Sequence, residues 1–393
     1  MVLITKEALV IHPKLSVYGG AEYLCLKTCM ILQGLGFHVN LVSDTFKPSE
    51  AERLFGMGDV LSKCNNVPLP APRRLEGILL PAGRLIYTIS LAKFANSLKR
   101  TDYNLVVSTQ SSIFAFPRTK LYHFVYELSD LFNYPMPLAK GARPKGRWPK
   151  RLYFRLLGVL YRGIAGSPKP NWFYVTGRKV LDGLRELGYE NSSFFYPPAR
   201  MLDLKLPKKP QVIQACRIAP EKRLEFMFDV ARRLPDTQFY LIGKNLPGQL
   251  ASNPGYSQKL LSTIPPNVRY FEDLIRNQLG LLEHSKVYFH TGLEKGILLI
   301  LIEAMSAGCV LVVPEKSVAG EVVRASGVGY QYQTADEAAA ILKLCLEGST
   351  PWTPEEISRR AREIGPKGFE RLIAKLGGVS SQIPEEQLVT KPD

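Results

Sequence analysis

The sequence has no apolar run long enough for a membrane-spanning helix. Such a helix needs about 18 or more consecutive apolar residues, and no such stretch occurs in the 393 residues. The first residues, MVLITKEALVIHP, lead straight into a predicted strand and do not show the pattern of a signal peptide. We therefore expect the protein to be made and kept in the cytosol.

Patterns that would bind a metal are also missing. The six cysteines lie mostly inside predicted helices or strands with apolar neighbours, which favours small core residues over disulfides. Cys25 and Cys29 are one helical turn apart, but no second Cys or His pair completes a zinc site. There is no convincing Asp-x-Asp motif. We expect neither a structural metal nor a metal cofactor.

Acidic residues are absent from one long stretch, 131–181, which we call the acid-free segment. Aromatic and aliphatic residues are interleaved with its bases, and a helix beginning near Pro149 would show a basic edge beside an apolar face. This pattern is typical of a segment that lies in an anionic membrane surface. The bases are Lys140, Arg143, Lys145, Arg147, Lys150, Arg151, Arg155, Arg162, Lys169, Arg178 and Lys179.

Two other interpretations of the acid-free segment stay open. The same charge, part of a net +16, would suit nucleic acid, but no recognised nucleic-acid-binding motif accompanies it. An ordinary amphipathic helix packed on its own domain is the second alternative. We predict an anionic membrane surface as a partner and no nucleic acid.

The pattern of apolar runs predicts two α/β domains. The chain exceeds the usual size of one hydrophobic core, and in both halves short apolar runs alternate with helical patterns, as in doubly wound parallel sheets. Prolines and lysines break both periodicities within 197–210. The expected domains are 1–203 and 204–378, followed by a flexible tail, 379–393. The predicted strands are 8–11, 39–43, 105–108, 121–125, 212–216, 238–242, 268–271, 287–290 and 310–313, and the main helices are 21–34, 86–99, 223–234 and 335–346.

Two glycines follow the first predicted strand. Gly19 and Gly20 open the helix at Ala21, which allows the backbone to come close to a phosphate or sugar at the helix N-terminus. A plain tight turn would explain the same two glycines. The dinucleotide-binding pattern is not met, because no third glycine follows at the required spacing.

Charged residues mark a second candidate site in the other half. Arg217 and Lys222 flank the loop after a predicted strand, where their charges would suit a diphosphate; a solvated loop pair is the alternative. Glu303 lies in an apolar helix that Gly308 ends. Because a buried carboxylate needs a partner, Glu303 is held by an internal donor or contacts ligand hydroxyls.

The order of these landmarks resembles that of the family 4 glycosyltransferases of the GT-B fold. His290, the run from Glu303 to Gly308, and Gly320 with Glu321 are similar to the C-terminal half of that family. The N-terminal Gly-Gly loop, the Arg217 and Lys222 pair and the Tyr196-Pro-Pro198 segment follow the same family order. The resemblance covers nearly the whole chain and implies two Rossmann-like domains facing across a cleft.

The resemblance also implies roles for single residues. Arg217 and Lys222 would hold the phosphates of a nucleotide-sugar donor, and Glu303 would contact its ribose. His123 would hydrogen-bond a hydroxyl of the transferred sugar, and Glu294 would contact the same sugar. Transfer would retain the anomeric configuration without an enzyme nucleophile, because the departing phosphate deprotonates the acceptor on the same face. The absence of an obvious glycosidase-type carboxylate pair agrees with this.

One position departs from the family pattern. The family places a first Glu eight residues before the second, and here that position is Lys295. Glu294 stands one residue too early. Three interpretations stay open: a one-residue loop adjustment brings Glu294 into place, Lys295 serves instead, or the donor site is altered.

The resemblance and the acid-free segment together predict a retaining glycosyltransferase, with a mannosyltransferase as one candidate, that acts on a lipid-linked glycan at the cytosolic face of a membrane. The lipid-linked acceptor rests on the acid-free segment. A soluble transferase with a small or polysaccharide acceptor is one alternative. A catalytically degenerate binding subunit is another, and Lys295 keeps it open.

Overall fold

The structure is a computed structural model of the whole chain. It describes residues 6–12, 15, 20–43, 47–68, 89, 90, 93, 94, 97, 103–109, 121–125, 152, 153, 156, 159, 160, 163, 164, 172–186, 189–243, 255–272, 276–293 and 299–379. The predicted helix 86–99, most of the acid-free segment and nearly all of the predicted tail lie outside these residues.

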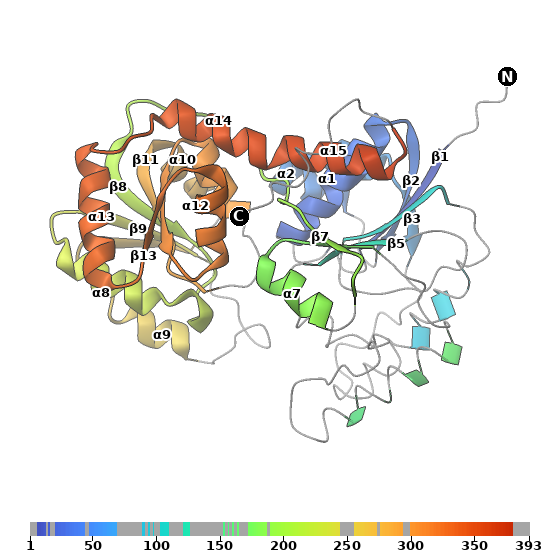
Figure 1. Cartoon of the computed structure of the whole chain (residues 1–393), viewed down its shortest axis with the longest axis horizontal. Coiled ribbons are helices and arrows are strands. Elements are labelled where there is room, and N and C mark those ends of the chain that lie inside the picture. Colours follow the sequence, from blue (N-terminus) through green and yellow to red (C-terminus); the bar gives the residue numbers. More distant parts are fainter. Residues whose placement is uncertain are drawn as a thin grey trace. The chain divides into compact units, whose positions relative to one another are not determined.

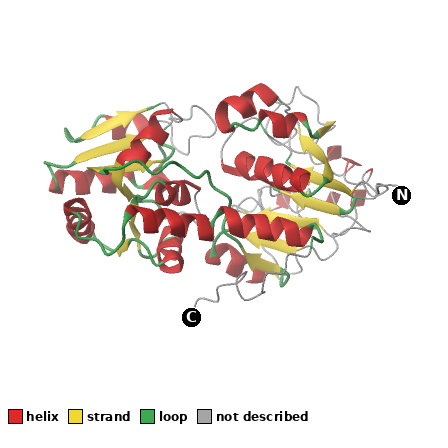
Figure 2. Ribbon diagram, turned by 90° about the horizontal axis from the view of Figure 1, so that it is seen from above, coloured by secondary structure: helices red, strands yellow, loops and turns green. Residues whose placement is uncertain are grey.

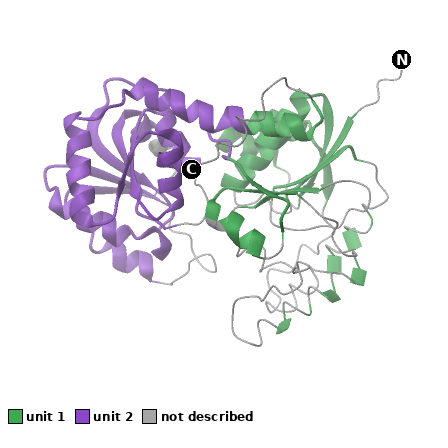
Figure 3. Ribbon diagram, in the orientation of Figure 1, with its two compact units in different colours: residues 1–195, 369–389 green, residues 196–368, 390–393 purple. Residues whose placement is uncertain are grey.

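The chain forms two compact units (Figure 3). Unit 1 comprises Met1–Phe195 and Phe369–Val389, and unit 2 comprises Tyr196–Gly368 and Thr390–Asp393. In each unit, helices flank a sheet of parallel strands (Figure 2). This is the predicted pair of doubly wound α/β domains.

Unit 1 contains a seven-stranded sheet in the order β3-β2-β1-β4-β5-β6-β7, with all pairs parallel. The central strands are almost fully buried, as their unbroken apolar runs predict. The strands are β1 (Lys6–Ile11), β2 (Phe37–Ser43), β3 (Asn65–Pro68), β4 (Leu105–Ser108), β5 (Leu121–Val125), β6 (Trp172–Val175) and β7 (Ser192–Phe194). The helices are α1 (Gly20–Gly34), α2 (Pro48–Phe55), α3 (Gly58–Ser62), α7 (Arg178–Glu186) and most of α15 (Pro366–Leu376).

Unit 2 repeats this arrangement with six parallel strands in the order β10-β9-β8-β11-β12-β13 (Figure 1). The strands are β8 (Lys209–Ala215), β9 (Gln238–Ile242), β10 (Val268–Phe271), β11 (Ser285–Phe289), β12 (Val310–Pro314) and β13 (Tyr330–Tyr332). The helices are α8 (Leu224–Arg233), α9 (Tyr256–Leu261), α10 (Arg276–His284), α11 (Leu299–Ser306), α12 (Val318–Ser326), α13 (Ala335–Glu347) and α14 (Pro354–Ile364), with a 3₁₀ turn at Pro220–Lys222.

Each sheet has one point at which the strand order reverses. In unit 1 it lies between β1 and β4, and in unit 2 it lies between β8 and β11. Open α/β sheets bind ligands outside the carboxyl ends of the strands at such switch points. The topology therefore directs the search for a site to the residues that follow these four strands.

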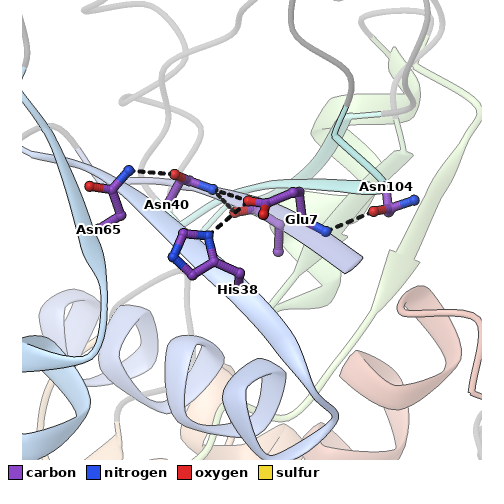
Figure 4. A network of polar contacts seen from close by, with 6 residues as sticks. Glu7, His38, Asn40, Asn65 and Asn104 are labelled. Carbon is purple, nitrogen blue, oxygen red and sulfur yellow. Dashed lines mark hydrogen bonds and ion pairs between the residues drawn. The ribbon is translucent and has the colours of Figure 1, made fainter. Parts of the chain in front are cut away.

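At the opposite edge of the unit 1 sheet, where the strands begin, polar side chains form a hydrogen-bonded network (Figure 4). The Nδ2 of Asn40 donates to Glu7 Oε2 at 2.7 Å, and the Nδ2 of Asn65 donates to Asn40 Oδ1 at 2.7 Å. His38 Nδ1 lies 3.0 Å from Glu7 Oε2, and the backbone N–H of Glu7 donates to Asn104 Oδ1 at 2.7 Å. These contacts tie four neighbouring strands together, so we assign the network to the register of the sheet.

The structure divides the chain differently from the sequence-based domains. It places the boundary after Phe195, whereas the prediction placed it after 203, and it returns Phe369–Val389 to unit 1. Phe369 is 1% exposed, and its ring lies 5.6 Å from that of Phe124 and 5.8 Å from that of Phe195. This aromatic contact is the physical reason that α15 packs with the N-terminal sheet.

Candidate functional site

In unit 2, a hydrogen bond spans the switch point. Gln214, in β8, donates from Nε2 to the Oγ1 of Thr291, which follows β11, at 2.8 Å. Thr291 Oγ1 in turn donates to the backbone carbonyl of Lys222 at 2.6 Å. Both Gln214 and Thr291 are fully buried. This relay fixes the position of Lys222 against the carboxyl edge of the sheet.

The loop after β8 carries the two predicted phosphate-binding residues, but it does not present them equally. The side chain of Arg217 is 53% exposed and lies 3.4 Å from Glu221. Lys222 is only 4% exposed and belongs to the 3₁₀ turn. The two residues predicted to hold the phosphates therefore differ in exposure, and their role stays a prediction. The Thr291 hydroxyl holds the backbone carbonyl of Lys222.

The residue that follows Lys222 has an unusual backbone. Arg223 is the one non-glycine residue with a positive φ, 51°, within the described part of the chain, and it precedes α8. Such a conformation costs of order 1 kcal/mol or more and gathers at ligand sites. The Arg223 guanidinium lies over the ring of Phe226, 5.1 Å from its centroid. The sequence analysis did not identify this residue.

A glycine lets two loops of this edge approach each other. A Cβ added at Gly243, which follows β9, would lie 2.3 Å from the backbone oxygen of Cys216. No side chain fits there, so the loops after β8 and β9 meet backbone to backbone. This close approach explains why a glycine follows the predicted strand 238–242.

Glu303 lies in α11, the helix that follows β11 and its loop, and is 5% exposed. Its Oε1 accepts a hydrogen bond from Arg200 Nε at 3.1 Å. The buried carboxylate that the sequence predicted therefore has an internal partner, which the sequence analysis did not identify. Gly308 ends the helix as predicted, with a φ of 81°.

In unit 1, the switch point holds a buried polar cluster. His12 follows β1, and its Nδ1 lies 2.9 Å from the Oγ1 of Thr109, which follows β4. His12 Nε2 lies 3.7 Å from Glu22 Oε1, in the first turn of α1. Burial alone would lower the pKa of His12, but the charge and hydrogen bonding of Cys25 and Glu22 raise it to about 10. Burial likewise opposes ionisation of Cys25, yet its hydrogen bond to Cys29 and the charge of His12 lower its pKa to about 5.

The cluster predicts how stability depends on pH. A raised His12 pKa stabilises the fold most below about 6.5, and this stabilisation is lost as the pH rises towards 10. A lowered Cys25 pKa acts in the opposite sense and offsets the loss up to the ordinary thiol pKa of about 9. Between about pH 5 and pH 6.5 only the Cys25 contribution changes, so the melting temperature of the wild type should rise there, and the rise should be smaller in His12→Gln, which removes the charge that lowers the Cys25 pKa. Thermal unfolding between pH 5 and pH 6.5 measures this, with exposed His38→Gln as control; parallel curves for wild type and His12→Gln in this range would contradict the assignment.

His123, which the resemblance assigns to a hydroxyl of the transferred sugar, is buried in the sheet of unit 1. It is the third residue of β5 and is 1% exposed. Its ring stacks on Phe173 at 5.2 Å. Burial lowers the pKa of His123 to about 3, so it is neutral near pH 7. Within the described residues, neither ring nitrogen has a hydrogen-bond partner, and its predicted contact with a sugar hydroxyl stays a prediction.

Other predicted site residues lie outside the described part of the chain. These are Gly19, Glu294 and Lys295. Gly20 is described and is the exposed first residue of α1, at the carboxyl edge of unit 1.

Among the described residues, no group of three or more His, Cys, Asp or Glu side chains is placed to hold a metal ion. No described helix is both long and apolar enough to cross a membrane.

Comparison with known proteins identifies the fold. No protein-family model and no curated protein matches the sequence. Among solved structures, WaaG, a glycosyltransferase involved in lipopolysaccharide biosynthesis, is 13% identical, with 96% of this chain and 100% of that chain covered and a TM-score of 0.64. Sucrose-phosphate synthase from Thermosynechococcus elongatus is 14% identical over 95% and 98% of the two chains, with a TM-score of 0.66. HepE from Anabaena, in complex with UDP and glucose, is 14% identical over 94% and 98%, with a TM-score of 0.65.

The chain has the GT-B fold. The two Rossmann-like units agree with this, since the order of the first six strands in unit 1 is repeated in unit 2, and so do the solved glycosyltransferase structures that cover nearly the whole chain. The GT-B fold was predicted from the order of the sequence landmarks and is confirmed.

Proposed function

We propose that the protein is a retaining glycosyltransferase of the family 4 type that uses a nucleotide-diphosphate sugar. One observation carries the proposal: the relay from Gln214 through Thr291 to Lys222 at the switch point of unit 2. It holds a buried lysine on the loop that also carries Arg217. Cationic groups held in place in this way stabilise a leaving group that gains negative charge.

In the proposed reaction, the bond between the anomeric carbon and the phosphate oxygen breaks, and the acceptor oxygen bonds to that carbon on the same face. The acceptor hydroxyl gives its proton to the departing nucleoside diphosphate. Lys222 and Arg217 stabilise the diphosphate, and Glu303 accepts hydrogen bonds from the ribose. No metal is part of this proposal, since the two cations supply the positive charge that the leaving group needs.

The experiment that tests this combines binding and transfer. UDP, GDP and ADP are screened by thermal shift, and the corresponding sugar nucleotides, GDP-mannose among them, are screened for transfer with and without EDTA. We expect one nucleotide to raise the melting temperature and its sugar to be transferred with retention in both conditions. Nucleotide binding without transfer from any donor would favour the catalytically degenerate binding subunit.

We further propose that the acceptor is a lipid-linked glycan and that unit 1 docks on the cytosolic face of a membrane. Three described helical residues of the acid-free segment expose apolar side chains: Leu152 is 43% exposed, Leu156 60% and Val159 54%. In the helix that the sequence predicts from near Pro149, a spacing of four and three residues would put these side chains on one face. Together with the bases of this segment in the sequence, they fit insertion into an anionic headgroup region.

The membrane proposal predicts salt-sensitive binding to liposomes. Wild-type protein should sediment with vesicles containing phosphatidylserine at low salt, because each base near such a surface contributes about 1 kcal/mol. Replacing Leu152, Leu156 and Val159 with Ser should weaken sedimentation, and replacing Arg147, Lys150, Arg151 and Arg155 with Glu should abolish it. Replacing exposed Leu344 of unit 2 with Ser is the control. Wild-type protein that ignores these vesicles but binds DNA with a steep salt dependence would overturn the proposal.

A further inference from the structure

The partner of Glu303 comes from the segment with which unit 2 begins. This segment, 196–208, has no regular secondary structure, and Arg200 within it pairs with Glu303 at 3.1 Å. The side chains are 24% and 7% exposed, respectively. Because neither charge is fully solvated, the two charges of this pair are screened less by water than those of an exposed ion pair.

Further contacts hold the same segment on α11. The backbone N–H of Leu202 donates to Ser306 Oγ at 2.9 Å, and Ser306 Oγ donates to the carbonyl of Glu303 at 2.7 Å. A Cβ added at Gly308 would lie 2.7 Å from Leu204. The segment is therefore fixed along one turn of the helix, and the backbone of Arg200 has a defined place relative to Glu303.

This arrangement restricts what the Glu303 carboxylate does. One of its oxygens, Oε1, is engaged by Arg200, which limits rotation about the terminal side-chain torsion. A carboxylate offers acceptor oxygens only. Ribose hydroxyls need an acceptor of this kind in a fixed orientation, whereas a deoxyribose has fewer hydroxyls to offer.

We propose that Arg200 is a positioning residue that orients Glu303 to recognise the ribose hydroxyls, so that the protein selects ribonucleotides over deoxyribonucleotides. This inference rests on the proposed nucleotide-sugar function. It adds to the proposed site Arg200, a residue to which the family resemblance assigns no role. Arg200 acts through Glu303 and need not touch the nucleotide.

The test measures the coupling between Arg200 and the sugar hydroxyls. Dissociation constants are determined by calorimetry for UDP and 2′,3′-dideoxy-UDP, and for the guanosine and adenosine pairs, with wild type, Arg200→Gln and Arg200→Lys. Arg232→Gln is the matched control, because Arg232 is an exposed arginine of the same unit that donates to a backbone carbonyl. Wild type and Arg232→Gln should prefer the ribonucleotide by about tenfold or more. In Arg200→Gln this preference should fall to about twofold, while binding of the dideoxynucleotide stays unchanged.

A double variant guards against misfolding. Arg200→Gln leaves a buried carboxylate unpaired, which destabilises a fold, whereas Arg200→Gln with Glu303→Gln leaves no unpaired charge. The double variant should lose the ribose preference to the same extent as Glu303→Gln alone. Equal weakening of both nucleotide forms in Arg200→Gln, or an unchanged preference in either variant, overturns this inference while the proposed function stands. Wild-type protein that binds none of the nucleotides overturns both.

Discussion

Replacing Lys222 with alanine is expected to lower kcat/KM for the sugar nucleotide by about 10- to 150-fold, the factor that corresponds to one charge-assisted hydrogen bond. Lys222 is 4% exposed, and its backbone carbonyl accepts a hydrogen bond from Thr291, so the backbone from which its side chain extends is held in place. Steady-state kinetics with the nucleotide sugar that binds in the screen, together with the melting temperature, measure the effect.

Arg217→Ala tests whether an exposed cation on the same loop matters as much as the buried Lys222. Arg217 is 53% exposed and lies beside Glu221, so its loss should have a smaller effect than the loss of Lys222. Lys222→Met keeps most of the side-chain volume and should lose as much activity as Lys222→Ala. Full activity in Lys222→Met, with an unchanged melting temperature, would remove Lys222 from the donor site.

Replacing Phe369 with alanine is expected to destabilise unit 1 by about 3 to 5 kcal/mol, the usual loss for a buried phenylalanine. Phe369 is 1% exposed and contacts the rings of Phe124 and Phe195. Because these two partners belong to unit 1, the effect should fall on that unit. Chemical denaturation measures the free energy of unfolding, and hydrogen exchange locates the change.

Lys367→Ala is the control for Phe369→Ala, since Lys367 is an exposed residue of the same helix. It should change the free energy of unfolding by less than about 0.5 kcal/mol. Loss of exchange protection mainly in the strands of unit 2 in Phe369→Ala would contradict the assignment of α15 to unit 1.

Buried strands and long helices could be predicted from the sequence alone. Strands 105–108, 121–125, 238–242 and 268–271 have the predicted bounds, and the helix predicted at 335–346 extends by one residue. Their apolar runs are local and unambiguous. The strands β3, β6, β7 and β13 were not predicted. Asn65–Pro68 contains two asparagines and a proline, Trp172–Val175 follows a proline-rich stretch, and the other two are only three residues long.

The residues of the candidate site likewise include some that could be predicted from the sequence and some that could not. Glu303, Gly308 and the strand ends were predicted from local pattern, because a carboxylate in an apolar helix and a glycine after it are visible in sequence. Gln214 and Thr291 were missed, since a single polar residue near a strand end does not reveal its partner 77 positions away. The one available signal was a glutamine inside the buried strand QVIQA.

The sequence by itself determined that this protein has two doubly wound α/β halves, a buried acidic residue in the second half and an acid-free basic segment in the first. These features follow from periodicity, composition and the order of landmarks, which are properties of neighbouring residues. Only the tertiary structure decided that Arg200 pairs with Glu303, that Thr291 holds Lys222 and that Phe369 returns to unit 1. Each of these contacts joins residues far apart in the chain. The sequence shows which residues tend to be buried, but it does not show which distant residues are buried against each other.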